Sequence, residues 1–257
     1  ARTLKRQGVQ NVYFVCPQFW AWRPWRANLV RRRFAHGLCI FPFEQEWYRS
    51  RGVRADFIGH PLVGNVTAKR SRAEFAAFLG LDEDKPIVTL LPGSRGGEIA
   101  HHLPSLVTAC HLIGKSRPVQ FVLALAPGMN KSQIAQYLSS DAPIHVVEDA
   151  TYDALGAADL AIVSSGTATV EAALMDTPMI VIYRLAPITA AIARCLVRTR
   201  TFAMVNLIAG RLVVPELVQK DFTPERVANE AIRLLDSPDA RAEMRRGLSE
   251  VREKLGP

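Results

Sequence analysis

The sequence contains few cysteines and no long apolar run. Its four cysteines, Cys16, Cys39, Cys110 and Cys195, lie far apart, so they indicate neither a zinc site nor a disulfide framework. We expect them to be buried thiols. No stretch approaches the roughly 20 apolar residues that span a bilayer, and the first residues lack the pattern of a secretory signal. These absences predict a cytoplasmic protein.

Several nucleotide-binding and catalytic signatures are absent as well. No G-x-G-x-x-G follows an expected strand and no P-loop lysine is present, so motifs for NAD or ATP are not supported. Neither H-E-x-x-H nor G-x-S-x-G occurs, which removes common signatures of zinc proteases and serine hydrolases. Internal repeats and low-complexity segments are also missing.

Positive charge is concentrated in the first part of the chain. Residues 1–72 contain 14 Lys and Arg against 3 Asp and Glu, whereas residues 73–257 contain 18 against 21. A basic region of this kind can bind nucleic acid, an anionic membrane surface or a phosphorylated substrate. No RNA- or DNA-binding motif accompanies it, which makes a nucleic-acid-binding module the weaker alternative.

The segment FWAWRPWRANLVRRRF contains three tryptophans and five arginines. Trp and Arg together favour the interface between water and lipid headgroups, because indole is amphipathic and guanidinium binds phosphate. Alternatively, the aromatic side chains pack inward while Arg31, Arg32 and Arg33 face solvent. Both interpretations stay open on the sequence.

Short apolar runs alternate with helical patterns along most of the chain, which predicts βαβ units and parallel sheets. The expected strands cover residues 11–16, 37–41, 55–58, 86–91, 119–124, 144–147, 160–163 and 179–183. The polar, basic stretch 67–72 has no periodicity and is predicted to link two domains. Residues 185–204 predict an amphipathic helix packed on the second domain, and residues 223–255 predict two helices separated near Ser237 and Pro238.

Two strand-to-helix turns carry residues suited to a phosphorylated ligand. In DLAIVSSGTATVEAALMDTPMIVIYR, small residues at 164–166 follow a buried strand, and Thr167 or Thr169 is expected to cap the next helix. A helix N-terminus presents unpaired N–H groups and a partial positive charge, which suits a diphosphate. Glu171, about one turn into this helix, is placed to accept hydrogen bonds from ribose hydroxyls.

The other turn, PGSRGGE, places Arg95 on a glycine-rich backbone, where its guanidinium can bind a phosphate oxygen. Glu98 is expected to orient Arg95 or to cap the following helix. Both turns also have a purely structural explanation, because doubly wound domains place small residues at such turns for packing. His60 and Asn206 are open in the same way, since each can hold either a ligand or the backbone.

Several longer stretches carry a family resemblance. LLPGSRGGEI, SSGTATVEAALMDTPMIVIYRL and MVNLIAGRLVVPELVQ, preceded by WAWRP, FPFEQEWY and FIGHPL, resemble lipid-A-disaccharide synthases in the same order along nearly the whole chain. The Glu171 helix also occurs in the related lipid II transferase, whereas the combination of stretches is specific. The resemblance implies an α/β protein of GT-B type, with Rossmann-like, doubly wound parallel sheets, a partial first domain and a complete second one.

The implied domains are residues 1–66, the remainder of an acceptor and membrane-side domain, then residues 67–222, the UDP-sugar donor domain, and the C-terminal helices in 223–257. The implied reaction moves 2,3-diacylglucosamine from UDP-2,3-diacylglucosamine to 2,3-diacylglucosamine 1-phosphate (lipid X), with inversion and without metal or cofactor. Implied partners are these lipids, the anionic inner-membrane surface, to which the protein would bind peripherally, and a second copy in a homodimer; nucleic acid is not among them.

Carried over residue by residue, the resemblance implies diphosphate contacts at Ser94, Arg95, Ser165, Gly166, Thr167 and Thr169, and a ribose contact at Glu171. Glu98 belongs to the same expected substrate site. Analogy with the lipid II enzyme implies that the backbone at Val146 and Val147 meets uracil. Asn206 and Arg211 are expected on the same cleft.

The chain departs from the family in one respect. Members carry a Gly/Ser-rich acceptor motif and an acidic residue, thought to be the general base, in a segment earlier than Ala1. An inverting transfer needs a base, and no residue here inherits that role, so the catalytic residue is unknown. We expect the true N-terminus to lie earlier and these 257 residues to bind UDP-sugar weakly or not at all and to transfer nothing alone.

Two alternatives accompany this prediction. The first is another GT-B enzyme that acts on a UDP-sugar, such as a lipid II type GlcNAc transferase or a UDP-GlcNAc 2-epimerase. It would share the Glu171 helix without needing the WAWRP stretch. The second, from a different class, is a non-catalytic module that binds nucleic acid through the basic first part.

Overall fold

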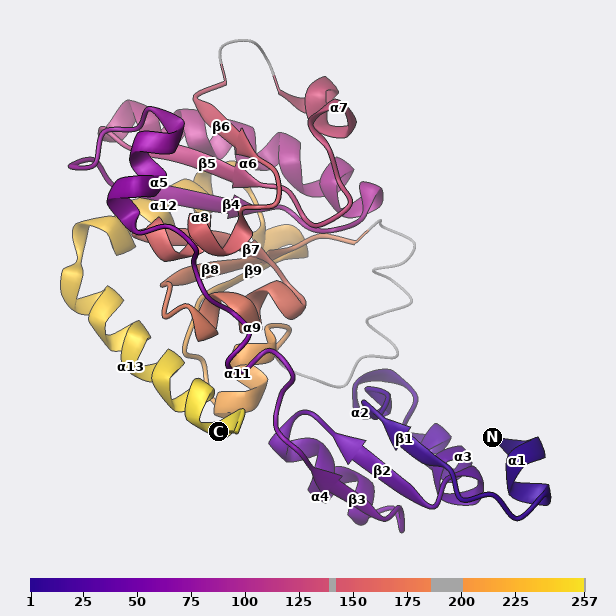
Figure 1. The fold of residues 1–257 in the computed structure, drawn as a ribbon. Helices are drawn as coiled ribbons and strands as arrows, with labels where there is room; N and C mark the ends of the chain where they lie inside the picture. The colour runs from indigo at the N-terminus through magenta and orange to yellow at the C-terminus, as the bar shows by residue number, and fades with distance from the viewer. Residues whose placement is uncertain (139–141, 186–200, 257) are drawn as a thin grey trace.

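A computed structural model describes residues 1–138, 142–185 and 201–256, which form two separate parallel β-sheets (Figure 1). The smaller sheet has the order β1-β2-β3, with β1 at Val12–Phe14, β2 at His36–Cys39 and β3 at Ala55–Phe57. The larger sheet has the order β6-β5-β4-β7-β8-β9. Its strands are β4 (Ile87–Leu91), β5 (Gln120–Ala124), β6 (Ile144–Val147), β7 (Leu160–Ser164), β8 (Met179–Tyr183) and β9 (Glu216–Val218). All neighbouring strands are parallel, so the predicted α/β class is confirmed.

The strand order reverses direction between β4 and β7. From β4 the chain passes through α6 (Gly96–Ser116) to β5 on one side, and from β7 it passes through α9 (Thr167–Leu174) to β8 on the other. Ligands of open parallel sheets bind at such a reversal, beyond the carboxyl ends of the strands. The residues of β4 and β7 are all buried, as expected for central strands covered by helices on both faces.

The helices divide between the two sheets. Around the smaller sheet lie α1 (Arg2–Arg6), α2 (Phe19–Trp22), α3 (Ala27–Arg33) and α4 (Pro42–Arg49), together with the 3₁₀ turn Pro24–Arg26. The remaining short helices are α5 (Arg72–Leu79), α7 (Lys131–Ile134), α8 (Thr151–Ala157) and α11 (Met204–Ala209). The last two helices, α12 (Pro224–Asp236) and α13 (Pro238–Lys254), confirm the predicted pair, and α12 packs along α6. None of the helices in the described residues is long and apolar enough to cross a bilayer.

The tryptophan and arginine segment divides between the interior and the surface. Trp20 packs inward, where its indole N–H donates to Glu44 Oε1 at 2.9 Å and its ring meets Phe43 edge-on. Trp22 and Trp25 are 40% and 60% exposed, so the expectation that the aromatic side chains pack inward is correct for only one of the three. The arginines at 31–33 are exposed.

The linker between the sheets is fixed to the larger one by a buried carboxylate. Asp153 of α8 accepts hydrogen bonds from the backbone N–H groups of Lys69 and Arg70 at 2.5 and 3.0 Å. Its other oxygen pairs with the Arg70 guanidinium at 2.7 Å. The contact holds residues 67–70 beside the carboxyl ends of the larger sheet.

Two details differ from the sequence predictions. Strand β9 was not predicted, because it has only three residues at the edge of the sheet. The apolar segment around Asn206 forms the short helix α11, which was not among the predicted helices. Cys16, Cys39 and Cys110 are buried free thiols as predicted, while Cys195 and most of the predicted helix at 185–204 lie outside the described residues.

Candidate functional site

A cavity of about 570 Å³ opens at the carboxyl ends of the central strands of the larger sheet. Its walls come from the turns after β4, β5, β6 and β7, and from linker residues Thr67 and Lys69. Of the twelve residues predicted for the substrate site, seven line it: Ser94, Arg95, Glu98, Ser165, Gly166, Thr167 and Glu171. The two phosphate turns identified in the sequence therefore face one cavity.

The turn after β4 is organised by Glu98. Its Oε2 accepts the backbone N–H of Ser94 at 3.0 Å, and its Oε1 pairs with Arg95 Nη1 at 3.1 Å. The Glu98 side chain is only 16% exposed, whereas that of Arg95 is 80% exposed. Gly93 has φ +130°, and a Cβ atom there would come within 2.5 Å of Glu98 Oε2, so this turn needs glycine. The sequence left two roles open for Glu98, and the carboxylate both orients Arg95 and binds the turn at the start of α6.

The turn after β7 leads into α9 without a side-chain cap. Gly166 is the N-cap residue with φ 154°, so the prediction that Thr167 or Thr169 caps the helix is wrong. Thr169 is fully buried, and its hydroxyl donates to the Gly166 carbonyl at 2.8 Å. The Ser165 hydroxyl donates to the Phe202 carbonyl, also at 2.8 Å. The first N–H groups of α9 thus receive no side-chain cap at the cavity wall.

Ser164, the last residue of β7, lines the cavity with a buried hydroxyl. Within residues 1–138, 142–185 and 201–256, its Oγ has no hydrogen-bond partner. Buried hydroxyls nearly always have a hydrogen-bond partner. Because this one has none in the described part of the chain, its oxygen is available to a ligand in the cavity. From the sequence, Ser164 is only one of the small residues at the turn after a buried strand.

Glu171 meets Tyr152 across the cavity wall. The Tyr152 hydroxyl donates to Glu171 Oε1 at 3.1 Å. Burial raises the pKa of the Glu171 carboxyl, and the hydrogen bond from Tyr152 opposes that rise. Burial and the neighbouring Glu171 charge raise the pKa of Tyr152, which keeps its hydroxyl protonated as a donor. Sequence reasoning missed Tyr152, because this contact joins α8 to α9 and has no local signature.

The other five predicted residues do not line the cavity. Val146 and Val147 belong to β6, where the Val147 carbonyl accepts the N–H of Leu125 within the sheet. Thr169 points its hydroxyl into its own helix start, as described above. The Val147 carbonyl and the Thr169 hydroxyl are thus used within the fold, and the residues after β6, from Asp149 to Asp153, line the wall instead.

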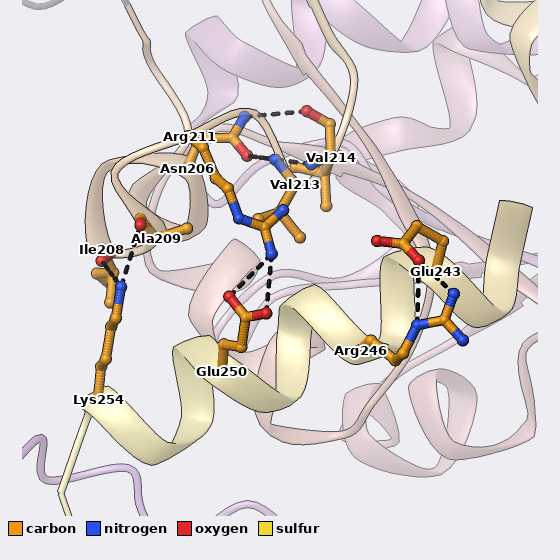
Figure 2. Close-up of polar contacts among 10 residues, drawn as sticks. All are labelled: Asn206, Ile208, Ala209, Arg211, Val213, Val214, Glu243, Arg246, Glu250 and Lys254. Atoms are coloured by element: carbon orange, nitrogen blue, oxygen red, sulfur yellow. Dashed lines mark hydrogen bonds and ion pairs between the residues drawn. The ribbon is translucent and has the colours of Figure 1, made fainter.

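Asn206 and Arg211 lie near α13, as Figure 2 shows. Asn206 is buried, its Oδ1 accepts the N–H groups of Val213 and Val214, and its Nδ2 donates to Val214 O and Glu216 Oε1. The sequence left open whether Asn206 holds a ligand or the backbone, and in this structure it holds the backbone. Arg211 pairs with Glu250 of α13 at 2.8 Å.

His60 also has a structural position. Its backbone N–H donates to the Leu255 carbonyl at 2.8 Å, its Nδ1 accepts the Leu62 N–H, and its ring lies against Phe41.

Among the described residues, no three His, Cys, Asp or Glu side chains are gathered as a protein-held metal ion would require.

Solved structures with the same fold include glycosyltransferases and epimerases. UDP-GlcNAc 2-epimerase from Neisseria meningitidis, solved with UDP-GlcNAc bound, gives a TM-score of 0.63 at 13% identity, over 95% of this chain and 66% of that chain. MurG from Acinetobacter baumannii gives 0.54 at 14% identity, over 98% and 64%. Identities this low establish the fold alone, which is of the GT-B type.

Sequence comparison identifies the family. A family model described as lipid-A-disaccharide synthetase matches residues 1–256. The chain is 46% identical over 257 residues to the lipid-A-disaccharide synthase of Solibacter usitatus (strain Ellin6076), over 99% of this chain and 67% of that protein. It therefore spans about two thirds of the length of the curated relatives it matches. With parallel sheets, a cavity at their switch point and a match over the whole chain, this protein belongs to the lipid-A-disaccharide synthase family of glycosyltransferases.

Proposed function

We propose that the cavity binds the UDP-sugar donor of a glycosyl transfer that joins 2,3-diacylglucosamine to 2,3-diacylglucosamine 1-phosphate. The observation that carries this proposal is that Arg95, the start of α9 and Glu171 converge on one cavity. A guanidinium and an uncapped helix start suit a diphosphate, and a carboxylate suits a ribose diol. A volume of about 570 Å³ is within the usual range for a site of this size of ligand.

In the proposed reaction, the acceptor hydroxyl attacks the anomeric carbon from the face opposite UDP. A new bond to oxygen forms, the bond to the β-phosphate oxygen breaks, and UDP leaves with an additional negative charge. Arg95 and the first N–H groups of α9 stabilise that charge, because they are already oriented before it develops. The proton of the attacking hydroxyl passes to a base.

We propose that this base lies outside the 257 residues, since none of the matched stretches offers it. On this proposal the chain binds UDP-sugar weakly and transfers no sugar alone. Transfer catalysed by residues 1–257 without any addition would contradict it.

The acceptor side is proposed to rest on an anionic membrane surface. Exposed Trp22 and Trp25 lie beside the basic helix α3, and the Arg23 guanidinium carbon lies 4.1 Å from the centre of the Trp22 ring. Amphipathic aromatics beside guanidinium groups are typical of peripheral membrane contacts.

Titration of UDP into the chain, with UMP and ADP for comparison, tests the donor site. Ligand-observed NMR detects weak binding, and calorimetry gives the affinity where it is high enough. We expect UDP to bind better than ADP. Arg95→Ala and Glu171→Ala should each weaken UDP binding roughly tenfold, because each substitution removes at least one charge-assisted hydrogen bond to the ligand.

Matched control variants come from an exposed ion pair on α13. Arg246 and Glu243 pair with each other away from the cavity (Figure 2), so Arg246→Ala and Glu243→Ala remove the same types of charge without touching the site. Equal UDP binding by the controls and by Arg95→Ala would overturn the proposed donor site. So would a folded chain that shows no UDP binding at millimolar ligand.

A further inference from the structure

We propose that Tyr152 is a positioning residue for nucleotide recognition. Its hydroxyl holds one oxygen of Glu171, so that the other carboxylate oxygen is directed at the ribose hydroxyls of a uridine nucleotide. This inference rests on the proposed function of Glu171 and names the residue on which that function depends.

The geometry assigns the two carboxylate oxygens different tasks. Oε1 accepts from the Tyr152 hydroxyl at 3.1 Å, and no hydrogen bond to Oε2 occurs within the part of the chain that the structure describes. Both side chains line the same cavity, and both are partly buried. A carboxylate held at one oxygen loses the freedom to rotate, which prepares the other oxygen for a ligand.

The hydrogen bond also opposes the effect of burial on the charge of Glu171. Burial favours the neutral carboxylic acid, which would be a poor acceptor for a diol, and the Tyr152 hydroxyl favours the ionised form. The other charged groups on the cavity wall are two cations and three carboxylates: Lys69, Arg95, Glu98, Asp149 and Asp153. Glu98 is paired with Arg95, and Asp153 with Arg70. Among the described residues, the hydrogen bond to the Glu171 carboxylate comes from Tyr152.

The first test needs no ligand. The pKa of the Glu171 carboxyl is measured by carbon-detected NMR in the wild-type chain and in Tyr152→Phe, which keeps the ring and removes only the hydroxyl. We expect a higher Glu171 pKa in the variant, because a hydrogen bond to the ionised form is lost. Tyr13→Phe, the same change in the smaller sheet, should leave it unchanged.

The second test compares UDP with 2′-deoxy-UDP. We expect the Tyr152→Phe variant to bind UDP about fivefold more weakly than wild type and to bind 2′-deoxy-UDP nearly as well as wild type. The ratio of its affinities for UDP and 2′-deoxy-UDP should therefore be smaller than in wild type. A substitution that only destabilised the fold would lower the affinity for both ligands equally. For the pH profile the ligand is UDP-N-acetylglucosamine, whose phosphates do not titrate near neutrality. The acid limb of its binding should move to higher pH in Tyr152→Phe.

The outcomes separate this inference from the proposed function. Loss of UDP binding in Glu171→Gln, with an unchanged Glu171 pKa and unchanged discrimination in Tyr152→Phe, would overturn the role of Tyr152 alone. Unchanged UDP binding in Glu171→Gln would overturn the ribose contact itself, and with it this inference.

Discussion

Ser164 places a buried hydroxyl against the cavity without a partner in the described residues. An unpaired buried hydroxyl costs roughly 1 kcal/mol or more, and its place on the cavity wall leads us to expect that a ligand supplies the missing bond. The sequence VSSGT gives no indication of this, because it depends on what surrounds the end of β7 rather than on residue type.

We predict that Ser164→Ala separates stability from binding. Removal of the unpaired oxygen should raise the free energy of unfolding of the ligand-free chain by about 1 kcal/mol in urea titrations. The same change should weaken UDP binding about fivefold, because the ligand loses a hydrogen bond. Ser132→Ala on α7, where the hydroxyl already bonds Asn130, is a matched control and should not raise stability. A less stable Ser164→Ala chain with full affinity would contradict both statements.

From the sequence, two candidate residues could be located on the cavity wall, while their contacts with a ligand stay predictions. Arg95 and Glu171 sit at defined positions in strand-to-helix turns, and both reach the cavity. Tyr152 and Asn206 have roles fixed by partners on other elements, so no local pattern could assign them. Asn206 was expected on the cleft because the family resemblance implies it, yet four hydrogen bonds to its own neighbourhood account for its position.

At the scale of elements, buried His102 of α6 connects the two halves of the larger sheet. Its Nε2 accepts the backbone N–H of Arg184, at the end of β8, at 3.0 Å. The proton is therefore on Nδ1, which donates to the carbonyl of Pro92, in the turn after β4, at 2.7 Å. A single neutral imidazole thus links, by two hydrogen bonds, the turn that carries Arg95 to the end of β8.

We predict that this tie makes folding stability depend on pH. Burial lowers the pKa of His102, so the unfolded chain, with an ordinary histidine pKa near 6.5, binds the proton more readily than the native chain. The contribution of neutral His102 to the free energy of unfolding is therefore complete at pH values above this unfolded-state pKa and decreases as the pH falls below it. Denaturant titrations at several pH values should show a smaller decrease on acidification in His102→Gln than in wild type. Parallel pH curves for the two proteins would contradict this prediction.

Most elements were predictable because parallel sheets need continuous apolar strands joined by helices. Strands β4, β5, β7 and β8 read as apolar runs, and their predicted ranges agree with the structure to within one or two residues. The short edge strand β9 was missed because its three residues bury only one side chain, which leaves a weak hydrophobic signal. The sequence also could not show that linker residues Thr67 and Lys69 form part of the cavity wall, since the linker is held by Asp153, which follows Lys69 by 84 positions in the chain.

At the scale of the whole molecule, charge is segregated between the two sheets. The first 72 residues carry the excess of cations, and their exposed Trp22 and Trp25 lie on the smaller sheet's side, away from the cavity. The remaining residues have slightly more acids than bases. This division suits a protein that contacts anionic lipid with one part and a soluble nucleotide moiety with the other.

We predict that the chain sediments with phosphatidylglycerol vesicles and not with phosphatidylcholine vesicles, and that salt weakens the association. Trp22→Ser with Trp25→Ser should reduce it about tenfold, because buried indole area is lost. Leu212→Ser, which removes an exposed apolar side chain from the larger sheet's side, is the control and should have no effect. Equal sedimentation with both kinds of vesicle would contradict the proposed membrane surface.

The strand order of the larger sheet also governs when the site can exist during synthesis. β7 pairs with β4, although more than 60 residues, including β5 and β6, separate them along the chain. The cavity takes its walls from the turns after all four of these strands, so no shorter stretch contains it. Pairings between distant segments form slowly because a long loop must close first. On the proposed function, a ribosome must therefore release residues beyond Glu171 before nascent chains can bind nucleotide, and in refolding experiments we expect nucleotide binding to return with the slowest phase.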